Sequence, residues 1–485
     1  MNAVMKTLRW PAEPRDRKRL ALWTAEEIAE ATGGTASGAF QAAGVEMDSR
    51  DVRSGDLFFA LKGENSDGHR YLDKAFANGA VAAVVEAPIP QPHVLVEDTS
   101  RALELLASAA RNRASAQVIG VTGSVGKTGV KEAIFAALDR GSKGAAHRSV
   151  RSYNNHVGVP LSLARMPARS RFGVFEMGMN HAGEIAGLTV QVRPHVAVIT
   201  TIAPAHIENL GSEEAIADAK AEIFAGLEPG GTAVIPADNP HFARLRAAAE
   251  AKGARVMAFG RSGDAKVRLL DAIPSANGGS LVTAALDDRR LCYSVAEPGE
   301  HWVTNSLAVM GAVYAAGGDL GAAGLALAEM GGLKGRGARH RVPVPGGHAL
   351  LIDESYNANP ASMRATLTQL GATPATRRIA VLGSMKELGE FAPSFHAQLA
   401  EPLAEAHVDY AILVGDEMTA LARELGKAGN LKLGNALPYA HCQNPGEAIA
   451  ALEEFGLAGG DAVLVKGSNS VGLGRVVAHF TAREG

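Results

Sequence analysis

Cysteine, long apolar runs and a surplus of charge of either sign are all scarce in this chain of 485 residues. Its two cysteines, Cys292 and Cys442, lie in unrelated contexts and give neither a disulfide framework nor the spacing of a zinc site. No run of about 18 uncharged apolar residues occurs, so no membrane span is expected. The 48 basic and 51 acidic residues give a net charge of −3, which argues against a nucleic-acid-binding surface.

The N-terminal segment lacks what a secretion signal needs. Residues 1–19 are basic but contain no apolar core segment, so we do not expect a signal peptide. A frayed terminus is the simplest interpretation. Together with the low cysteine usage, which fits a reducing compartment, this predicts a cytoplasmic protein.

The strongest positive signal is a glycine turn between a strand-like run and a helix-like pattern. The β-branched run 118–121 is typical of a buried strand, and after it come Gly123, Ser124, Val125, Gly126, Lys127 and Thr128. Backbone N–H groups of the turn and the dipole of the following helix would together bind an anion. Lys127 would then reach the β- and γ-phosphates of a nucleotide, and the Thr128 hydroxyl would bind Mg²⁺.

The spacing of this turn is tighter than in the general P-loop motif, because Val121 stands where that motif has its first glycine. The alternative is a glycine turn followed by a chance Lys-Thr pair. The strand-like run before the turn and the helical pattern after it favour phosphate binding.

Length and pattern predict three α/β domains, at roughly 150 residues each. Alternating strand and helix patterns predict a parallel sheet in the centre, with an antiparallel patch near 266–294 that includes the turn dipeptide Asn277-Gly278. The glycine-rich segment 331–337 is typical of a linker. We expect a small N-terminal α/β domain over 1–113, a central P-loop ATPase domain over 114–332 and a C-terminal Rossmann-like domain over 333–485.

Three side chains in the central segment could complete a phosphate site. Glu176 ends a strand-like run and His206 follows another, and ligands of open α/β sheets bind at such strand ends. Both side chains could bind Mg²⁺. Each could instead be an ordinary loop or capping residue. Lys220 lies at the edge of an apolar helical stripe, where the alternative is a lysine on a solvated face.

An ordered array of motifs resembles the Mur ligase family. The central segment contributes the glycine loop, 153–161, 176–179, His206 and Lys220. The flanking segments contribute 48–50, 55–63, 353–363, 382–390 and 466–468. The resemblance covers nearly the whole chain from residue 24 onward.

The resemblance implies ATP and two Mg²⁺ ions as cofactors, and a role for each matching residue. Lys127 and the loop would hold the ATP phosphates, and further ATP contacts would come from Asn305, Arg336 and Asp353. Thr128 and Glu176 would bind one Mg²⁺, and His206 and a carbamylated Lys220 would bind the other. The catalytic residues would be Lys127, His206 and Lys220. Substrate would be bound by a uridine-recognition turn and an asparagine-rich set, namely Asp48, Ser49, Arg50, Asn154, Asn155, Tyr356, Asn357 and Asn359.

The activity implied is ATP-dependent amide formation in the cytoplasmic stage of peptidoglycan synthesis. A monomeric enzyme would join D-alanyl-D-alanine to UDP-N-acetylmuramoyl-tripeptide through an acyl phosphate, and the third residue of the peptide would be diaminopimelate or lysine. The alternatives are another Mur or folylpolyglutamate-type ligase, and a P-loop ATPase without ligase activity. Trp302, Ser384 and Asn469 depart from the family pattern, but none belongs to the phosphate or metal set.

Overall fold

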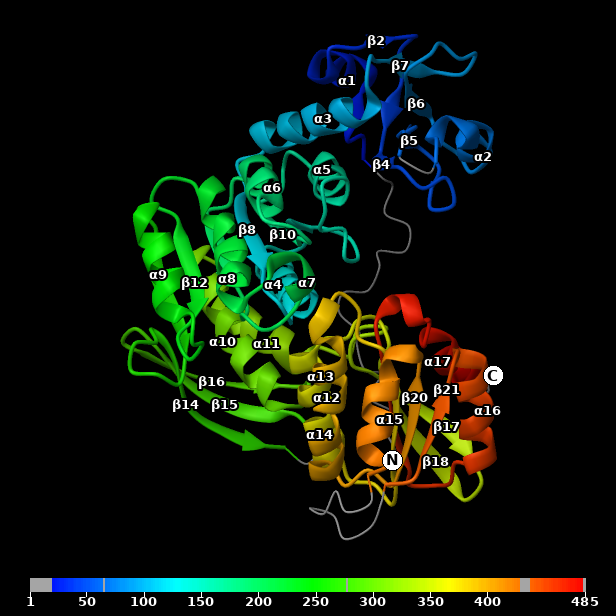
Figure 1. The fold of residues 1–485 in the computed structure, drawn as a ribbon. Coiled ribbons are helices and arrows are strands. Elements are labelled where there is room, and N and C mark those ends of the chain that lie inside the picture. The colour runs from blue at the N-terminus through cyan, green and yellow to red at the C-terminus, as the bar shows by residue number, and fades with distance from the viewer. Residues whose placement is uncertain (1–19, 64–65, 276–277, 428–436, 483–485) are drawn as a thin grey trace, which may run out of the picture.

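The chain folds into three α/β units that follow one another in sequence (Figure 1). The computed structural model describes residues 20–63, 66–275, 278–427 and 437–482, so the basic segment 1–19 lies outside it. The main sheets of the three units have five, nine and six strands. The expected three-unit α/β architecture is confirmed, whereas the boundaries at residues 113 and 332 stay a prediction.

The N-terminal unit is a small sheet covered by helices. Its strand order is β2-β7-β6-β5-β4, parallel except for β2, and β1 pairs with β3 in a separate ribbon. Thr24 and Glu27 form a reciprocal capping box that starts the first helix. The elements are β1 (Trp23–Thr24), α1 (Ala25–Thr32), β2 (Thr35–Ala36), β3 (Gln41–Ala42), β4 (Gly44–Glu46), β5 (Asp56–Phe59), α2 (Leu72–Ala77), β6 (Ala82–Val85), β7 (His93–Leu95) and α3 (Thr99–Arg113).

The central unit carries a sheet in the order β16-β15-β14-β13-β12-β11-β8-β10-β9. Strands β9 to β14 pair in parallel, and β14 to β16 form the expected antiparallel patch, although Asn277 of its turn lies outside the described residues. The elements are β8 (Gln117–Thr122), α4 (Lys127–Gly141), β9 (Ala146–Arg148), α5 (Gly158–Ala164), β10 (Phe172–Glu176), α6 (Glu184–Val192), β11 (Val196–Ile199), α7 (Ile207–Leu210), α8 (Glu213–Ala221), β12 (Thr232–Pro236), α9 (Phe242–Ala251), β13 (Arg255–Gly260), β14 (Val267–Pro274), β15 (Ser280–Leu286), β16 (Arg289–Val295), α10 (Glu300–Ala315) and α11 (Leu320–Glu329).

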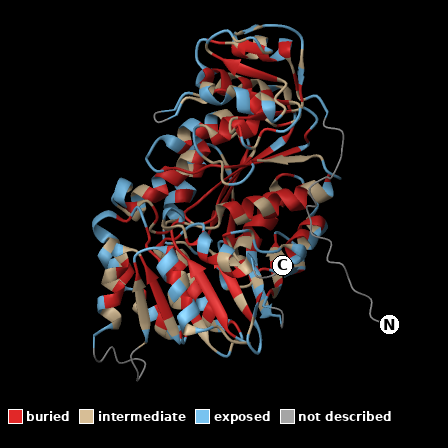
Figure 2. Ribbon diagram, turned by 90° about the vertical axis from the view of Figure 1, so that its right-hand side faces the viewer, coloured by how far each residue is buried: buried red, intermediate tan, exposed pale blue. Residues whose placement is uncertain are grey.

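The central strands β8, β10 and β11 are mostly apolar and buried (Figure 2), as is expected of parallel strands that helices cover on both faces of a sheet. In β8, every residue after Gln117 is buried, and both neighbouring strands, β10 and β11, are buried throughout. The carboxyl ends of these three parallel strands therefore meet at one edge. They deliver the glycine loop, Glu176 and the segment before His206 to the same place.

The C-terminal unit is a second, mostly parallel sheet with the order β17-β18-β22-β19-β20-β21. Only β17, at one edge, runs antiparallel to its neighbour. The elements are β17 (Ala338–Val344), β18 (Gly347–Glu354), α12 (Pro360–Ala372), β19 (Arg378–Gly383), α13 (Ala392–Ala397), α14 (Ala400–Glu405), β20 (Tyr410–Val414), α15 (Thr419–Leu425), β21 (Tyr439–Cys442), α16 (Pro445–Phe455), β22 (Ala462–Lys466) and α17 (Gly474–Thr481).

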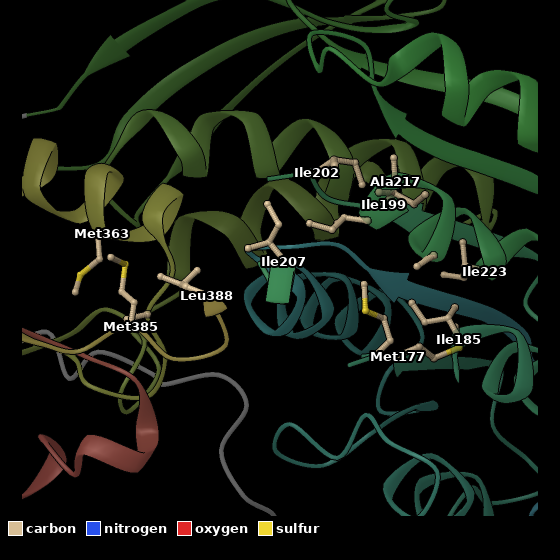
Figure 3. Packing of buried hydrophobic residues seen from close by; sticks show 14 of the residues in the cluster. Met177, Ile185, Ile199, Ile202, Ile207, Ala217, Ile223, Met363, Met385 and Leu388 are labelled. Carbon is tan, nitrogen blue, oxygen red and sulfur yellow. The ribbon is translucent and has the colours of Figure 1, made fainter. Parts of the chain in front are cut away.

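The central and C-terminal units share one apolar cluster where they meet. Ile207 at the start of α7 belongs to the same cluster as Met363, Met385 and Leu388 of the C-terminal unit. Figure 3 shows Ile207 between Ile202 on one side and Leu388 on the other. This contact holds the segment after β11 against the segment after β19, and so it sets how the two units face each other.

Candidate active site

The glycine loop lies between β8 and α4, as predicted, and two of its residues must be glycine. Gly123 and Gly126 have φ angles of 144° and 86°, a region that favours glycine. A Cβ atom at Gly123 would lie 2.0 Å from the Thr200 Oγ1 atom. At Gly126 it would lie 3.1 Å from the amide nitrogen of Asn305, so α10 packs directly against the loop. The loop and Asn305, which was predicted to contact ATP, are therefore neighbours.

Lys127 begins helix α4 and turns its side chain back over the loop. Its Nζ donates a hydrogen bond of 2.6 Å to the Gly123 carbonyl oxygen. Burial lowers the pKa of Lys127 to about 8, even though Glu176 and Glu387 act in the opposite direction. The loop thus holds an ammonium group beside the N-terminus of a 15-residue helix, an arrangement that suits a phosphate chain.

Thr128 and Glu176 form a buried polar pair next to the loop. The Thr128 hydroxyl donates to the Glu176 carboxylate at 2.8 Å, and the Asn154 side-chain amide donates to the other carboxylate oxygen at 2.8 Å. Glu176 is fully buried. A hydroxyl and a carboxylate are oxygen ligands of the kind that Mg²⁺ takes. Three predicted residues therefore meet here, in a set that fits a divalent cation.

Lys220 lies inside the protein, so its interpretation as a lysine on a solvated face is wrong. Its side chain is fully buried, and among the described residues its Nζ has no hydrogen-bond partner. The nearby acids are engaged elsewhere: Asp218 pairs with Arg244 at 2.9 Å, and Glu222 accepts hydrogen bonds from backbone N–H groups near the start of α6. Burial holds the pKa of Lys220 well below its ordinary value. A buried, unpaired amine of this kind is readily neutral.

His206 belongs to the central unit and contacts the C-terminal unit. It directly precedes α7 and forms an ion pair with Glu387, which follows β19. Both residues have left-handed backbone conformations, with φ of 60° and 65°. The hydrogen bond with His206, aided by the charges of His206 and Lys127, lowers the pKa of Glu387.

A cavity of about 360 Å³ lies between the central and C-terminal units. The predicted residues that line it come from both units and are Ser124, Val125, Gly126, Lys127, Asn154, Glu176, His206, Asn305, Arg336, Tyr356, Asn357 and Asn359. The Arg336 guanidinium stacks over the Tyr356 ring, 4.4 Å from its centroid. Most of the predicted site is thus brought together around one space.

Five predicted residues of the central and C-terminal units do not line this cavity. Gly123, Thr128 and Lys220 are buried and do not belong to its lining. Asp353 accepts a 2.8 Å hydrogen bond from the Gly335 N–H, so it fixes the glycine-rich linker rather than facing the space. Asn155 accepts a 2.9 Å hydrogen bond from the Gly158 N–H at the start of α5.

The predicted uridine-recognition turn lies elsewhere. Arg50 lines a second cavity, of about 600 Å³, between the N-terminal and central units. Asp48 pairs with Arg50 at 2.6 Å, and this contact lowers the pKa of Asp48 to about 2. Ser49 is buried, and its carbonyl oxygen accepts a hydrogen bond from Asn78. The structure therefore separates these three residues from the main cavity.

Further polar side chains that were not predicted as site residues also line the main cavity, among them Glu297, His301, Glu354, Glu387 and Lys466. Burial raises the pKa of Glu297 to about 7 and lowers that of His301 to about 4. Lys466 pairs with Glu354 at 3.5 Å. Glu354 and Lys466 lie within the motifs 353–363 and 466–468, and His301 lies four residues before Asn305, whereas Glu297 gave no signal in the sequence.

The three residues that depart from the family pattern, Trp302, Ser384 and Asn469, do not all line the main cavity. Trp302 and Asn469 both line the cavity, and Trp302 packs over Gly129 of α4, where a Cβ atom would be 2.9 Å away. Ser384 lies outside the lining, and its carbonyl oxygen accepts a hydrogen bond from Ser468.

Among the described residues, no group of three or more His, Cys, Asp or Glu side chains could hold a metal ion. The two predicted Mg²⁺ sites therefore stay predictions.

Comparison with known proteins identifies the family. Residues 121–313 match the family model of the Mur ligase middle domain, 340–469 match the Mur ligase glutamate ligase domain, and 41–114 match the Mur ligase family catalytic domain. The chain belongs to the Mur ligase family. The resemblance read from its motifs is thereby confirmed.

Individual Mur ligases align over almost the whole chain. The UDP-N-acetylmuramoyl-tripeptide–D-alanyl-D-alanine ligase of Synechocystis sp. is 35% identical over 442 residues, which cover 90% of this chain and 91% of that one. MurF from Acinetobacter baumannii has a TM-score of 0.81 at 30% identity and covers 96% of this chain and 100% of its own. The Thermotoga maritima MurF ligase, solved in complex with ADP, has a TM-score of 0.71 at 27% identity and covers 91% and 97%.

Within the described ranges, none of the helices combines the length and the apolar character that crossing a bilayer requires.

Proposed function

We propose that this chain is an ATP-dependent amide ligase that joins D-alanyl-D-alanine to UDP-N-acetylmuramoyl-tripeptide in peptidoglycan synthesis. The observation that carries the proposal is the cavity between the central and C-terminal units. One wall offers the glycine loop with Lys127, and the other offers Arg336 and the polar turn 356–359. A site with a phosphate-binding wall and a separate polar wall suits the joining of two substrates at the expense of ATP. The names of the relatives supply the two substrates.

The chemistry follows from the poor reactivity of a carboxylate as an acyl donor. The terminal carboxylate of the tripeptide attacks the γ-phosphorus of ATP, the bond from that phosphorus to the bridging oxygen breaks, and ADP leaves. The amine of the dipeptide then attacks the carbonyl carbon of the acyl phosphate, inorganic phosphate leaves, and an amide remains. Lys127 and the loop N–H groups offset the negative charge on the transferring phosphoryl group. Arg336, which stacks on Tyr356, adds a second cation from the opposite wall.

The proposal includes two Mg²⁺ ions, each held by a pair of side chains. The first pair can bind Mg²⁺ as it stands, whereas the second pair requires a modified lysine. Thr128 and Glu176, already joined by a hydrogen bond, would hold the first ion. His206 and Lys220 would hold the second, once CO₂ has converted the lysine into a carbamate. The buried, unpaired Nζ of Lys220 and its lowered pKa support that modification, because a carbamate forms only from a neutral amine. When bound, the ions supply positive charge beside the phosphates.

The remaining assignments extend the same proposal. The three domains would divide at residues 113 and 332, with 331–337 as the hinge that lets the C-terminal domain close. Asn305 would contact the adenine, Asp353 would act beside Arg336 on the nucleotide, and Asp48, Ser49 and Arg50 would recognise the uridine end of the substrate. Asn154, Asn155, Tyr356, Asn357 and Asn359 would contact the peptide substrates. The enzyme would work in the cytoplasm as a monomer.

Phosphate release tests the proposal directly. Purified protein is given ATP, Mg²⁺ and a UDP-N-acetylmuramoyl-tripeptide that carries either diaminopimelate or lysine, with and without D-alanyl-D-alanine. We expect fast phosphate release only when the dipeptide and one of the two tripeptides are both present, together with a new amide product. Hydrolysis of ATP that depends on neither substrate would favour a P-loop ATPase instead, and dependence on a single amino acid would favour another ligase of the family.

A further inference from the structure

The main cavity and the second cavity share a stretch of wall, the segment 149–154 between β9 and α5. Consecutive residues of this segment line different cavities, with Val150, Arg151 and Tyr153 on the second cavity and Ser152 and Asn154 on the main one. If the proposed function holds, UDP-N-acetylmuramoyl-tripeptide must follow this wall, because its uridine end would lie in the second cavity and its terminal carboxylate beside the phosphate loop.

The segment 149–154 is tied to the units on both sides of it. Arg151 pairs with Asp51 of the N-terminal unit at 2.9 Å, and the Ser152 hydroxyl accepts a hydrogen bond of 3.4 Å from the Arg336 guanidinium. The backbone at Arg151 is left-handed, with a φ angle of 54°. A residue with a side chain keeps this conformation only where the surrounding structure holds it. The segment therefore needs a firm support within the central unit.

The Lys131 side chain of α4 provides this support. Its Nζ donates hydrogen bonds of 3.0 Å to the Ser149 carbonyl oxygen and 2.8 Å to the Arg151 carbonyl oxygen, and it pairs with the Glu132 carboxylate at 2.7 Å. An ammonium group has three N–H donors, so each of them has an acceptor here. The side chain has no exposed surface. Lys131 thus fixes the backbone on both sides of Val150.

Helix α4 connects Lys131 directly to the phosphate loop. Lys127, which begins the helix, and Lys131 are four residues apart, so both lie on the same face of it. One rigid element therefore supports the groups that would bind the ATP phosphates and the wall that the tripeptide would follow. Attack on the γ-phosphorus needs the carboxylate to lie within about 3–3.5 Å of it, so the spacing of these two supports matters for the reaction.

Stability alone does not explain a charged side chain at position 131. The other residues of α4 that are buried beyond Thr128 are all apolar, as Val130, Ile134 and Leu138 illustrate. Replacing a buried ion pair with apolar groups of similar volume is often neutral or stabilising. The two carbonyl groups that Lys131 holds account for its ammonium group, and both belong to the shared wall.

We propose that Lys131 is a positioning residue for UDP-N-acetylmuramoyl-tripeptide, because it fixes the segment 149–154 along which this substrate runs from the second cavity to the phosphate loop. This proposal rests on the proposed function. Lys131 lies outside the lining of both cavities, so it acts through the segment. Its loss displaces the path of the tripeptide and leaves the phosphate loop in place.

The Michaelis constants of two substrates separate this role from a structural one. Lys131→Met keeps a long apolar side chain and removes the ammonium group. Phosphate release is measured while UDP-N-acetylmuramoyl-tripeptide and ATP are varied in turn, with the other substrates saturating. We expect kcat/KM for the tripeptide to fall about 10- to 100-fold, chiefly through a higher KM, whereas the KM for ATP changes less than about 3-fold. A merely structural loss would reduce the amount of active enzyme and leave both KM values unchanged.

Matched variants complete the experiment. Ile134→Val, three residues further along α4, removes a methylene from the apolar core and should lower the melting temperature without changing either KM. Lys131→Arg, which keeps the charge and the donors, should recover part of the normal KM for the tripeptide. If Lys131→Met does not fold, Lys131→Gln provides the same comparison, since it removes the charge and shortens the reach of the donor.

Two kinds of failure can be told apart. An unchanged KM for the tripeptide in Lys131→Met, or equal changes in the KM values for the tripeptide and ATP, would overturn the proposal for Lys131 alone. Absence of ligation in the wild-type protein would refute the proposed function, and the role of Lys131 with it.

Discussion

Thr128 donates a hydrogen bond of 2.8 Å to the Glu176 carboxylate and so joins the first turn of α4 to the end of β10. Glu176 has no water-exposed surface, and the Asn154 amide occupies its second oxygen. A buried carboxylate is costly unless it is paired, so the fold maintains this charge beside the phosphate loop for a purpose other than stability. The proposed binding of Mg²⁺ by Thr128 and Glu176 would account for it.

Replacement of Lys127 with alanine should stop ligation while the fold remains. The side chain contributes a cation at the start of α4, and its hydrogen bond to the Gly123 carbonyl oxygen is local. Removing a preorganised charge from a phosphoryl-transfer site costs on the order of 10²–10³ in rate or more. Phosphate release measures the loss, and Lys252→Ala on the exposed end of α9 is the matched control. Near-normal turnover in Lys127→Ala, with an unchanged melting temperature, would contradict the P-loop assignment.

Ligand binding should make the molecule more compact. The linker 331–337 contains Gly335 and Gly337 with φ of 74° and 95°, which other residues rarely adopt, and hinges are short segments that absorb such changes. Small-angle X-ray scattering of the protein with ATP analogue and UDP-peptide together should give a smaller radius of gyration than the free protein. The nucleotide alone is the comparison sample. A radius that stays the same at saturation would argue against closure at this linker.

The strands and the glycine loop could be predicted because their signals are local. Apolar runs such as 118–121 predict buried strands, and the turn after them has few alternatives once glycines and a following helix are present. The antiparallel patch near 266–294 was confirmed for the same reason. A pattern over a few neighbouring residues is enough to determine each of them.

The burial of single side chains and the identity of their contact partners could not be predicted, because both depend on segments that lie far apart in the chain. Lys220 is fully buried by the tertiary packing around α8, which the pattern around it does not reveal. The pairing of His206 with Glu387 joins residues 181 positions apart. The separate location of the turn at Asp48 likewise depends on how the N-terminal and central units meet. Motif resemblance assigned roles to these residues but gave no distances between them.

Glu297 should make the protein less stable as the pH rises. Its pKa of about 7 in the folded protein exceeds its ordinary value of 4.5, because burial disfavours the charged form and Glu354 adds repulsion, while Arg339 compensates only partly. Its contribution to stability is therefore complete below pH 4.5 and is lost as the pH rises through about 7. Glu297→Gln removes this dependence, so its stability relative to wild type should increase between pH 5 and pH 8, by at most about 3 kcal/mol.

Urea unfolding at several pH values measures this difference. Glu300→Gln, which removes an exposed carboxylate at the start of α10, is the control variant. A pH-independent difference for Glu297→Gln would mean that Glu297 is ionised throughout this range in the folded protein.

Replacement of Lys220 with alanine should abolish activity, and short carboxylic acids should restore part of it. An ammonium group would repel Mg²⁺, whereas a carbamate supplies two anionic oxygens of the type that this ion prefers. The buried Nζ has no hydrogen-bond partner among the described residues, and its lowered pKa provides the neutral amine that reacts with CO₂. Formate or acetate added to Lys220→Ala could occupy the vacated space and replace the missing oxygens.

The control for Lys220→Ala is a substitution of a nearby exposed residue on the same helix. Asp218 lies two residues earlier on α8 and pairs with Arg244 on the exterior, so Asp218→Ala should keep its activity and change stability by only about 0–1 kcal/mol. Carbonate-free buffer provides an independent test, because the wild-type enzyme should lose activity there and regain it when bicarbonate is added. Full wild-type activity without CO₂, together with an active Lys220→Ala, would exclude the carbamate. Loss of activity in Lys220→Ala without rescue, but with normal behaviour in carbonate-free buffer, would leave an unmodified lysine as the functional group.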